Sequence, residues 1–146
     1  MDRIKAVIDR LKNIDSQIQA TVKKVIEDNQ GIIVEMNSEL QLFEKGVDRN
    51  NVSISSYAPY GSSTITYKKA KRQPTNRVTL RDEGNFHQSF FLDIRENEFE
   101  IKAKDWKAEM LVRKYGEAIL GLTDENLSDL SKNYVAPEIL KLFKTL

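Results

Sequence analysis

The residues that could form a catalytic site are concentrated around His87, the only histidine of the chain. A serine-type hydrolase needs a hydroxyl, a histidine that accepts its proton and an acid that orients the histidine. Ser89 or another hydroxyl, together with an acid, would have to supply the other two groups. His87, however, lies in a short amphipathic turn next to Phe86, where a structural histidine accounts for the pattern without catalysis. Motifs of metalloproteases, nucleotide-binding loops and α/β-hydrolases are also missing from the sequence. We therefore predict that the protein is not an enzyme.

Metal binding would have to depend on carboxylates, because the chain has one histidine and no cysteine. The acidic cluster that could supply them consists of Asp93, Glu96, Glu98 and Glu100. Its spacing matches no EF-hand loop, and we interpret it as the solvated face of a strand pair. Asp82, Glu83 and Gly84 are interpreted as a turn, for which Gly84 supplies the backbone freedom. We expect neither a metal nor a cofactor.

Opposite charges are concentrated in two neighbouring stretches, although the net charge is only +1. From Arg49 to Arg81 there is no aspartate or glutamate, whereas the stretch from Asp82 to Glu100 is acidic apart from Arg95. The residues of the first stretch that are predicted to contact a subunit or DNA are Arg49, Tyr57, Tyr60, Lys68, Lys69, Lys71, Arg72, Arg77 and Arg81. Such cations pair equally well with phosphates, where tyrosines stack on bases, or with an acidic patch of another subunit. No RNP, KH or zinc-finger pattern decides between these partners.

The composition is that of a globular protein. The chain has 146 residues, 40% of them apolar and 31% charged, which suits one domain over residues 1–146 with a hydrophobic core. No apolar run approaches the roughly 20 residues that a membrane-spanning helix needs, and the first residues lack the apolar stretch of a secretory signal. The absence of cysteine excludes disulfides and fits a reducing compartment. We expect no contact with a membrane.

Residues 2–45 are predicted to be helical, because apolar residues recur at heptad spacing. One row consists of Ile4, Leu11, Ile18, Val25 and Ile32, and the second row of Ile8, Val22, Met36 and Phe43. Asn29, Gln30 and Gly31 are an expected break, so the segment forms either two joined helices or one long kinked helix. The apolar stripe packs either on its own domain or also on neighbouring subunits. The stripe alone favours packing on its own domain.

Residues 46–77 are predicted to form a loop or arm, because they are rich in glycine, proline, asparagine and serine. Residues 52–54 could add a short strand. Within the arm, Ser62, Ser63 and Thr64 could cap a basic helix over 65–72, although residues 64–67 suit a strand equally well. An arm of this length is typical of a binding or mobile segment.

Residues 78–104 are predicted to form the sheet, with an extended lead-in before the turn at Gly84 and strands over 90–94 and 99–103. Residues 105–146 are predicted to be helical. The first helix, over 105–115, should turn Trp106 and Met110 inward and end at Gly116. Thr123 should cap the next helix, whose buried face includes Leu127, Leu130 and Tyr134, and Pro137 should begin the last one. The fold class is therefore α+β, with a long N-terminal amphipathic helix or helix pair, a small antiparallel sheet, an extended basic arm and C-terminal helices.

Several of these features stand in an order that resembles a phage family. They are Phe43-Glu44-Lys45-Gly46-Val47-Asp48, Tyr57-Ala58-Pro59-Tyr60, Ser63-Thr64, Lys68-Lys69, Leu80-Arg81-Asp82-Glu83-Gly84-Asn85-Phe86-His87-Gln88-Ser89, Arg113-Lys114-Tyr115-Gly116 and Ile119-Leu120-Gly121-Leu122-Thr123-Asp124-Glu125. This order, over roughly residues 43–132, is similar to that of the virion-morphogenesis and tail-completion proteins of tailed bacteriophages. Glu83 and Phe86 depart from the residue types usual at those positions in the family.

The resemblance implies an α+β neck or tail component that forms a ring between the portal and the tail and performs no catalysis. Its partners would be other copies of the chain, portal or connector and tail proteins, and packaged DNA in the channel. It would be located in the virion, after assembly in the host cytoplasm. Asp82, Gly84, Gly116 and Gly121 would be structural turn positions.

The arrangement of charges suggests how such subunits would meet. Residues 46–77 would act as a basic arm that orders against the acidic face of a neighbour. The alternative is a nucleic-acid-binding module that uses the basic segment 65–81.

Overall fold

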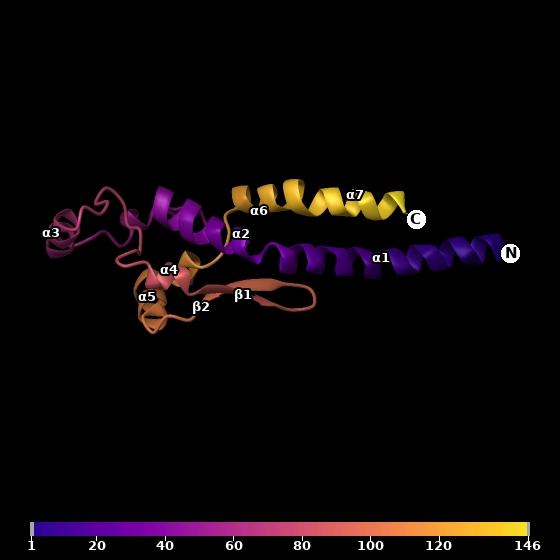
Figure 1. Ribbon diagram of the computed structural model, residues 1–146, viewed down its shortest axis with the longest axis horizontal. Helices are drawn as coiled ribbons and strands as arrows, with labels where there is room; N and C mark the ends of the chain where they lie inside the picture. Colours follow the sequence, from indigo (N-terminus) through magenta and orange to yellow (C-terminus); the bar gives the residue numbers. More distant parts are fainter. Residues whose placement is uncertain (1, 146) are drawn as a thin grey trace.

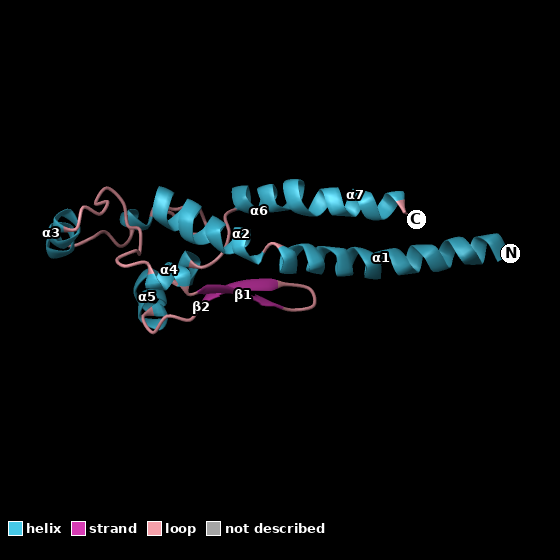
Figure 2. Ribbon diagram, in the orientation of Figure 1, coloured by secondary structure: helices cyan, strands magenta, loops and turns pink. Residues whose placement is uncertain are grey.

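The computed structural model describes residues 2–145 and confirms the α+β class. The molecule is elongated (Figure 1). The long helix α1 (Asp2–Asp28) lies antiparallel beside the C-terminal helix α7 (Ala136–Lys144), and a two-stranded hairpin lies on the other side, next to the C-terminal end of α1. Helix α3 (Ser62–Ala70) is at the opposite end of the molecule from both termini. Helices dominate the fold, as Figure 2 shows.

The N-terminal third is helical throughout, as predicted. Helix α1 is followed by α2 (Gln30–Glu35) and the π-helical segment η1 (Met36–Lys45). Asn29 separates α1 from α2, and its side chain donates a hydrogen bond to the carbonyl oxygen of Val25 at 2.8 Å. Asn29 itself leaves the helical conformation, with φ of −118° and ψ of 25°, while its backbone amide still donates to the carbonyl oxygen of Val25 at 3.1 Å. The expected break is therefore confirmed as two joined helices.

Residues 46–77, which were predicted to be a loop or arm, contain a β-bridge and two helices. Val47 and Ser53 form an isolated β-bridge, and the short helix η2 (Ile54–Ser56) follows it in place of the suggested strand. The strand alternative over 64–67 is wrong, because these residues belong to α3. The predicted hydroxyl cap is also wrong. Gly61 holds the cap position, while Ser62, Ser63 and Thr64 are already helical and cap nothing with their side chains.

Both predicted strands are confirmed, although the sheet does not extend over all of residues 78–104. Strands β1 (Phe90–Ile94) and β2 (Phe99–Ala103) pair antiparallel, with Phe90 opposite Ala103 and Ile94 opposite Phe99. The lead-in to the turn at Gly84 is not a strand, because Leu80 adopts a left-handed conformation with φ of 56°. The Thr79 hydroxyl there accepts a hydrogen bond from the Arg81 amide, so a local turn replaces pairing with a strand. The helix α4 (Asn85–Gln88) fills the space between this turn and β1.

The C-terminal third is helical as expected, but two inward side chains were wrongly assigned. Trp106 is 80% exposed and Met110 also faces solvent, because α5 (Ala108–Tyr115) begins after Trp106 and presents only its other face to the core. After η3 (Glu117–Ile119), the helix α6 (Asp124–Leu130) continues through π-helical η4 (Ser131–Val135) into α7. Pro137 lies in the first turn of α7, as predicted.

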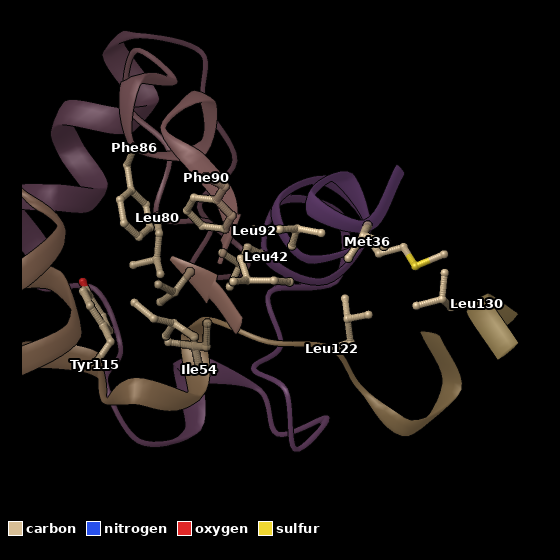
Figure 3. Close-up of a cluster of buried hydrophobic side chains, with 14 of the residues drawn as sticks. Met36, Leu42, Ile54, Leu80, Phe86, Phe90, Leu92, Tyr115, Leu122 and Leu130 are labelled. Atoms are coloured by element: carbon tan, nitrogen blue, oxygen red, sulfur yellow. The ribbon is translucent and has the colours of Figure 1, made fainter. Parts of the chain in front are cut away.

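The hydrophobic core joins residues that are far apart in the sequence (Figure 3). Its labelled members are Met36, Leu42, Ile54, Leu80, Phe86, Phe90, Leu92, Tyr115, Leu122 and Leu130. Phe86 and Phe90 meet edge to face, with ring centroids 5.0 Å apart. This core lies between η1, the hairpin and α5, so the first half of α1 extends beyond it.

Thr123 caps α6 as predicted, and its removal should have a measurable effect. The Thr123 hydroxyl accepts a hydrogen bond from the Asn126 amide at 3.2 Å. We expect Thr123→Ala to lower the free energy of unfolding by about 1 kcal/mol, because the amide loses its acceptor. Thr123→Ser should stay close to the wild type in the same urea titration. An alanine variant as stable as the serine variant would contradict this role.

Candidate functional site

The basic residues of the acid-free stretch are mostly engaged within the chain. Lys68 is only 6% exposed, and its Nζ donates to the carbonyl oxygen of Arg81 at 2.9 Å and to Oε1 of Gln73 at 3.3 Å. It also lies 5.0 Å from the centre of the Tyr60 ring. Lys68 therefore fastens α3 to the segment that precedes Gly84, and it is a structural residue rather than a contact for a partner.

Asp82 is the acceptor that completes this attachment of α3. It accepts hydrogen bonds from Tyr67, Lys71 and Gln73, and the Lys71 ammonium forms an ion pair with it at 3.2 Å. Burial alone would raise the pKa of Asp82, but the hydrogen bonds from Gln73, Lys71 and Tyr67 together lower it. Asp82 is thus part of a contact between two segments, a role that the predicted turn did not include.

The other predicted contact residues also have partners in the same chain. Two arginines donate to backbone carbonyl oxygens: Arg77 Nε to that of Phe43 at 2.7 Å, and Arg49 Nη1 to that of Leu120 at 3.3 Å. The Tyr57 hydroxyl donates to Asp48 at 3.1 Å, and the Tyr60 hydroxyl accepts from the Thr79 amide at 2.9 Å. Arg81 forms an ion pair with Glu39. Burial and the bond to Asp48 raise the pKa of Tyr57 to about 12. Among residues 2–145, the side chains of Lys69 and Arg72 remain exposed and make no hydrogen bond or ion pair. These two are the cations of the predicted set that a partner could reach without breaking such a contact.

His87 belongs to a buried structural cluster. Its Nδ1 accepts from Arg81, with Nε at 3.2 Å and Nη2 at 2.9 Å, and Arg81 continues to Glu39. Its Nε2 is buried without a hydrogen-bond partner in the described part of the chain. Burial, followed by the charge of Arg81, lowers the pKa of His87 to about 4. The Ser89 hydroxyl donates to the carbonyl oxygen of Phe86 and does not meet the histidine.

A buried polar network joins η1 to the segment before α6, and sequence reasoning missed it. Gln41 donates to the carbonyl oxygen of Gly121 at 2.8 Å and accepts from the Thr123 amide at 2.9 Å. Asn37, one turn earlier, accepts from the Gly121 amide and donates to the carbonyl oxygen of Ile119, both at 2.9 Å. Each amide side chain thus replaces the bonds of a strand partner for this irregular backbone.

The predicted turn glycines occupy left-handed conformations. Gly84 begins α4 with φ of 95°, and Gly116 ends α5 with φ of 94°. Gly121 has φ of 131°, and a Cβ there would lie 2.8 Å from Cδ of Arg49. Any other residue at this position would therefore strain the backbone and displace Arg49.

Carboxylates of the acidic cluster form ion pairs with basic side chains of the same hairpin. Lys102 lies 2.7 Å from Asp93, and Arg95 lies 2.9 Å from Glu98. Lys102 lowers the pKa of Asp93. No group of three or more potential metal ligands converges within residues 2–145.

The first half of α1 exposes a continuous apolar stripe. Ile4 is 64% exposed, and Val7, Ile8 and Leu11 also face solvent. At about 3.6 residues per turn, these side chains share one face of α1 with Val22 and Val25, which the body of the molecule covers. The same stripe is therefore partly or fully buried in its second half and exposed in its first. The prediction that it packs only on its own domain is wrong for residues 2–11.

Cations border the exposed stripe on both sides. Lys5 and Lys12 follow one edge of the stripe, Arg3 and Arg10 follow the other, and the acidic Asp2 and Asp9 lie on the back of the helix. We call residues 2–14 of α1 the N-terminal arm, or simply the arm from here on. It is distinct from the basic arm predicted over residues 46–77. An arm with this pattern fits an apolar surface whose rim is acidic.

A groove of about 1000 Å³ lies where α1 passes the hairpin. Its apolar lining consists of Ile18, Val22, Ile26, Ile94, Phe99, Ile101, Val112, Leu120, Leu122 and Leu127. Leu127 lines it with 40% of its surface exposed, which corrects its predicted burial. Charged side chains of the hairpin, including Glu96 and Glu98, form one rim. We call this space the hairpin groove.

No known protein family, curated protein or solved structure matches this chain significantly. Within residues 2–145, none of the helices combines the length and hydropathy needed to cross a bilayer.

Proposed function

We propose that this chain is a structural subunit that acts by docking onto other copies of itself, as a head–tail joining or tail-completion component of a tailed bacteriophage. The observation that carries the assembly role is the unpartnered apolar stripe of the N-terminal arm. The order of sequence features over residues 43–132 supports the phage version. A ring of such subunits would stand between the portal and the tail.

The energetics favour covering the arm. Ile4, Ile8 and Leu11 are exposed in the isolated chain. Fully burying one such side chain contributes roughly 1.5–3 kcal/mol, so a partner that covers all three gains several kcal/mol before the cost of association is subtracted. An aliphatic row of this size is typical of an interaction surface.

The geometry around His87 supports contact rather than catalysis as the role of the chain. His87 is buried and bonded to Arg81, and Ser89 is bonded to the backbone. The pair that a serine-type mechanism needs is therefore not assembled.

The nucleic-acid alternative has less support than the charge pattern suggested. Lys68, Lys71, Arg77 and Arg81 hold the fold together, which leaves Lys69 and Arg72 for phosphates. Two contacts would give weak binding with a shallow dependence on salt.

The phage version is tested in virions of the phage that encodes the chain. An antibody against the protein should label the joint between head and tail in electron micrographs. An amber codon in the reading frame should yield separate heads and tails in a nonsuppressing host, and supplying the protein in trans should rejoin them. Complete, infectious virions without the protein would contradict the proposal.

A further inference from the structure

We propose that the N-terminal arm of one copy lies in the hairpin groove of a second copy, so that the subunit contact runs head to tail. This inference rests on the assembly role proposed above and goes beyond it by naming both surfaces. The arm presents Ile4, Ile8 and Leu11 at the spacing by which an amphipathic helix enters a groove.

The arm cannot occupy the groove of its own chain. Helix α1 is a single helix of 27 residues, and its later side chains Ile18, Val22 and Ile26 form one wall of the groove. The arm is about 20 Å long at 1.5 Å per residue, and it continues straight away from the body (Figure 1). It can fill a groove only on another molecule.

The two surfaces match in their apolar parts. The groove volume of about 1000 Å³ is bordered by aliphatic and aromatic side chains from α1, the hairpin and α6. The arm offers Ile4, Val7, Ile8 and Leu11 as one exposed row. The row of the arm is exposed to water in the single chain, and the groove lining is partly exposed, most of all at Leu127. Docking would therefore remove both from water in one contact.

The charges match at two carboxylates of the groove, Glu96 and Glu117. The arm carries Arg3, Lys5, Arg10 and Lys12 beside its stripe, against the acidic Asp2 and Asp9 on its back. The groove has Glu96, Glu98, Glu100 and Glu117 at its margin, together with the cations Lys23, Arg49, Arg95 and Lys102. Arg95 and Lys102 neutralise part of this acidity, but Glu96 and Glu117 have no ion pair within residues 2–145. Cations that flank the arm would therefore meet unpaired carboxylates of the neighbour.

The charges argue against pairing of two arms with each other. In an antiparallel pair of arms, Lys5 and Lys12 would face the same residues of the second helix along the seam. Like charges at such positions oppose association. A groove contact avoids this repulsion. It also uses two different surfaces of each subunit, so successive copies close into a ring or extend as a filament.

Four single substitutions separate these arrangements. Ile8→Glu places a charge in the exposed stripe of the arm, and Leu127→Glu places one in the groove at an exposed position. Asn13→Glu adds the same charge on the back of the arm and serves as the matched control. Circular dichroism and thermal unfolding serve to check that each variant is folded. Glu96→Lys, at the exposed hairpin turn, is a second groove variant that leaves the apolar lining intact.

The test is light scattering after size-exclusion chromatography. We expect Asn13→Glu to assemble like the wild type, whereas Ile8→Glu and Leu127→Glu each elute as monomers. Glu96→Lys should weaken assembly by roughly tenfold. An equimolar mixture of Ile8→Glu and Leu127→Glu should form a one-to-one dimer and nothing larger, because only one intact arm and one intact groove remain in each pair.

Other results would overturn the inference in distinguishable ways. If Leu127→Glu and Glu96→Lys assemble normally while Ile8→Glu does not, the arms pair with each other, and the assembly role survives without the groove contact. If the wild type stays monomeric but binds vesicles of anionic phospholipid through Ile8, the arm is a membrane-surface helix, and both proposals fail. A mixture that stays monomeric also contradicts the head-to-tail contact.

Discussion

Gln41→Leu is expected to lower the free energy of unfolding by about 3 kcal/mol, because it removes the centre of the buried polar network. Gln41 is 1% exposed, and its side chain bonds to the backbone of Gly121 and Thr123 and to the side chain of Asn126. Leucine has a similar size, so the packing volume is nearly kept. The loss arises because the Thr123 amide and the Gly121 carbonyl are left without partners away from water.

The measurement is a urea titration followed by circular dichroism at one fixed, low protein concentration, so that association does not change the apparent stability. Glu44→Leu provides the matched control, since Glu44 is exposed on the same π-helical segment. The control should stay within about 0.5 kcal/mol of the wild type. A loss for Gln41→Leu no larger than that of the control would show that the network does not hold η1 to the segment before α6.

His87 should make the protein less stable as the pH falls from 7 to 4, by about 3 kcal/mol at most. Its pKa is about 4 in the folded chain, against 6.5 for an unperturbed histidine. The unfolded chain therefore binds more protons between these values, and stability rises with pH across this window. The limit follows from about 1.4 kcal/mol per pKa unit. The physical cause is the burial of the imidazole, to which the neighbouring Arg81 guanidinium adds its charge, while Glu39 opposes both.

His87→Gln removes this titration and keeps an oxygen that can accept from Arg81. We expect the free energy of unfolding of this variant to change much less than that of the wild type between pH 6.5 and 4. Asp82 and Asp93, whose pKa values are lowered, affect stability mainly below this window in both proteins. Parallel pH profiles for the two proteins would contradict the assigned pKa of His87.

The sequence was sufficient to predict the elements that depend on local pattern. Heptad spacing predicted the helical residues 2–45. Alternation of apolar and polar residues predicted the strand pair over residues 90–94 and 99–103. Thr123 was recognised as a cap because a hydroxyl followed by acids is a local signal. The same periodicity could not tell which half of α1 is covered, because coverage depends on where α7 and the hairpin lie.

The acid-free stretch was overinterpreted for a physical reason. Counting charges identifies only acidic side chains as partners for a cation. Lys68 and Arg77, however, donate hydrogen bonds to the backbone carbonyl oxygens of Arg81 and Phe43. Carbonyl oxygens carry no sequence signal. The burial of a lysine next to Tyr60 therefore became visible only in three dimensions.

Two residues of the polar network could have been recognised in the sequence as buried amides. Asn37 and Gln41 stand one turn apart in a helical segment whose neighbours Met36 and Leu42 are buried. Two amides on such a segment indicate that they bond to irregular backbone nearby. Their partner, the Gly121 segment, lies about 80 residues away in the sequence, so its identity required the fold.

Sedimentation equilibrium of the full chain over a wide range of concentrations tests the central claim most directly. The account predicts a weight-average mass that rises well above the monomer mass of 16.8 kDa as the concentration increases, and a constant monomer mass for Ile8→Glu. Raising the salt concentration should weaken the association of the wild type, because cations of the arm meet carboxylates. A wild-type mass that stays at 16.8 kDa at every concentration, with or without salt, would contradict assembly through this helix.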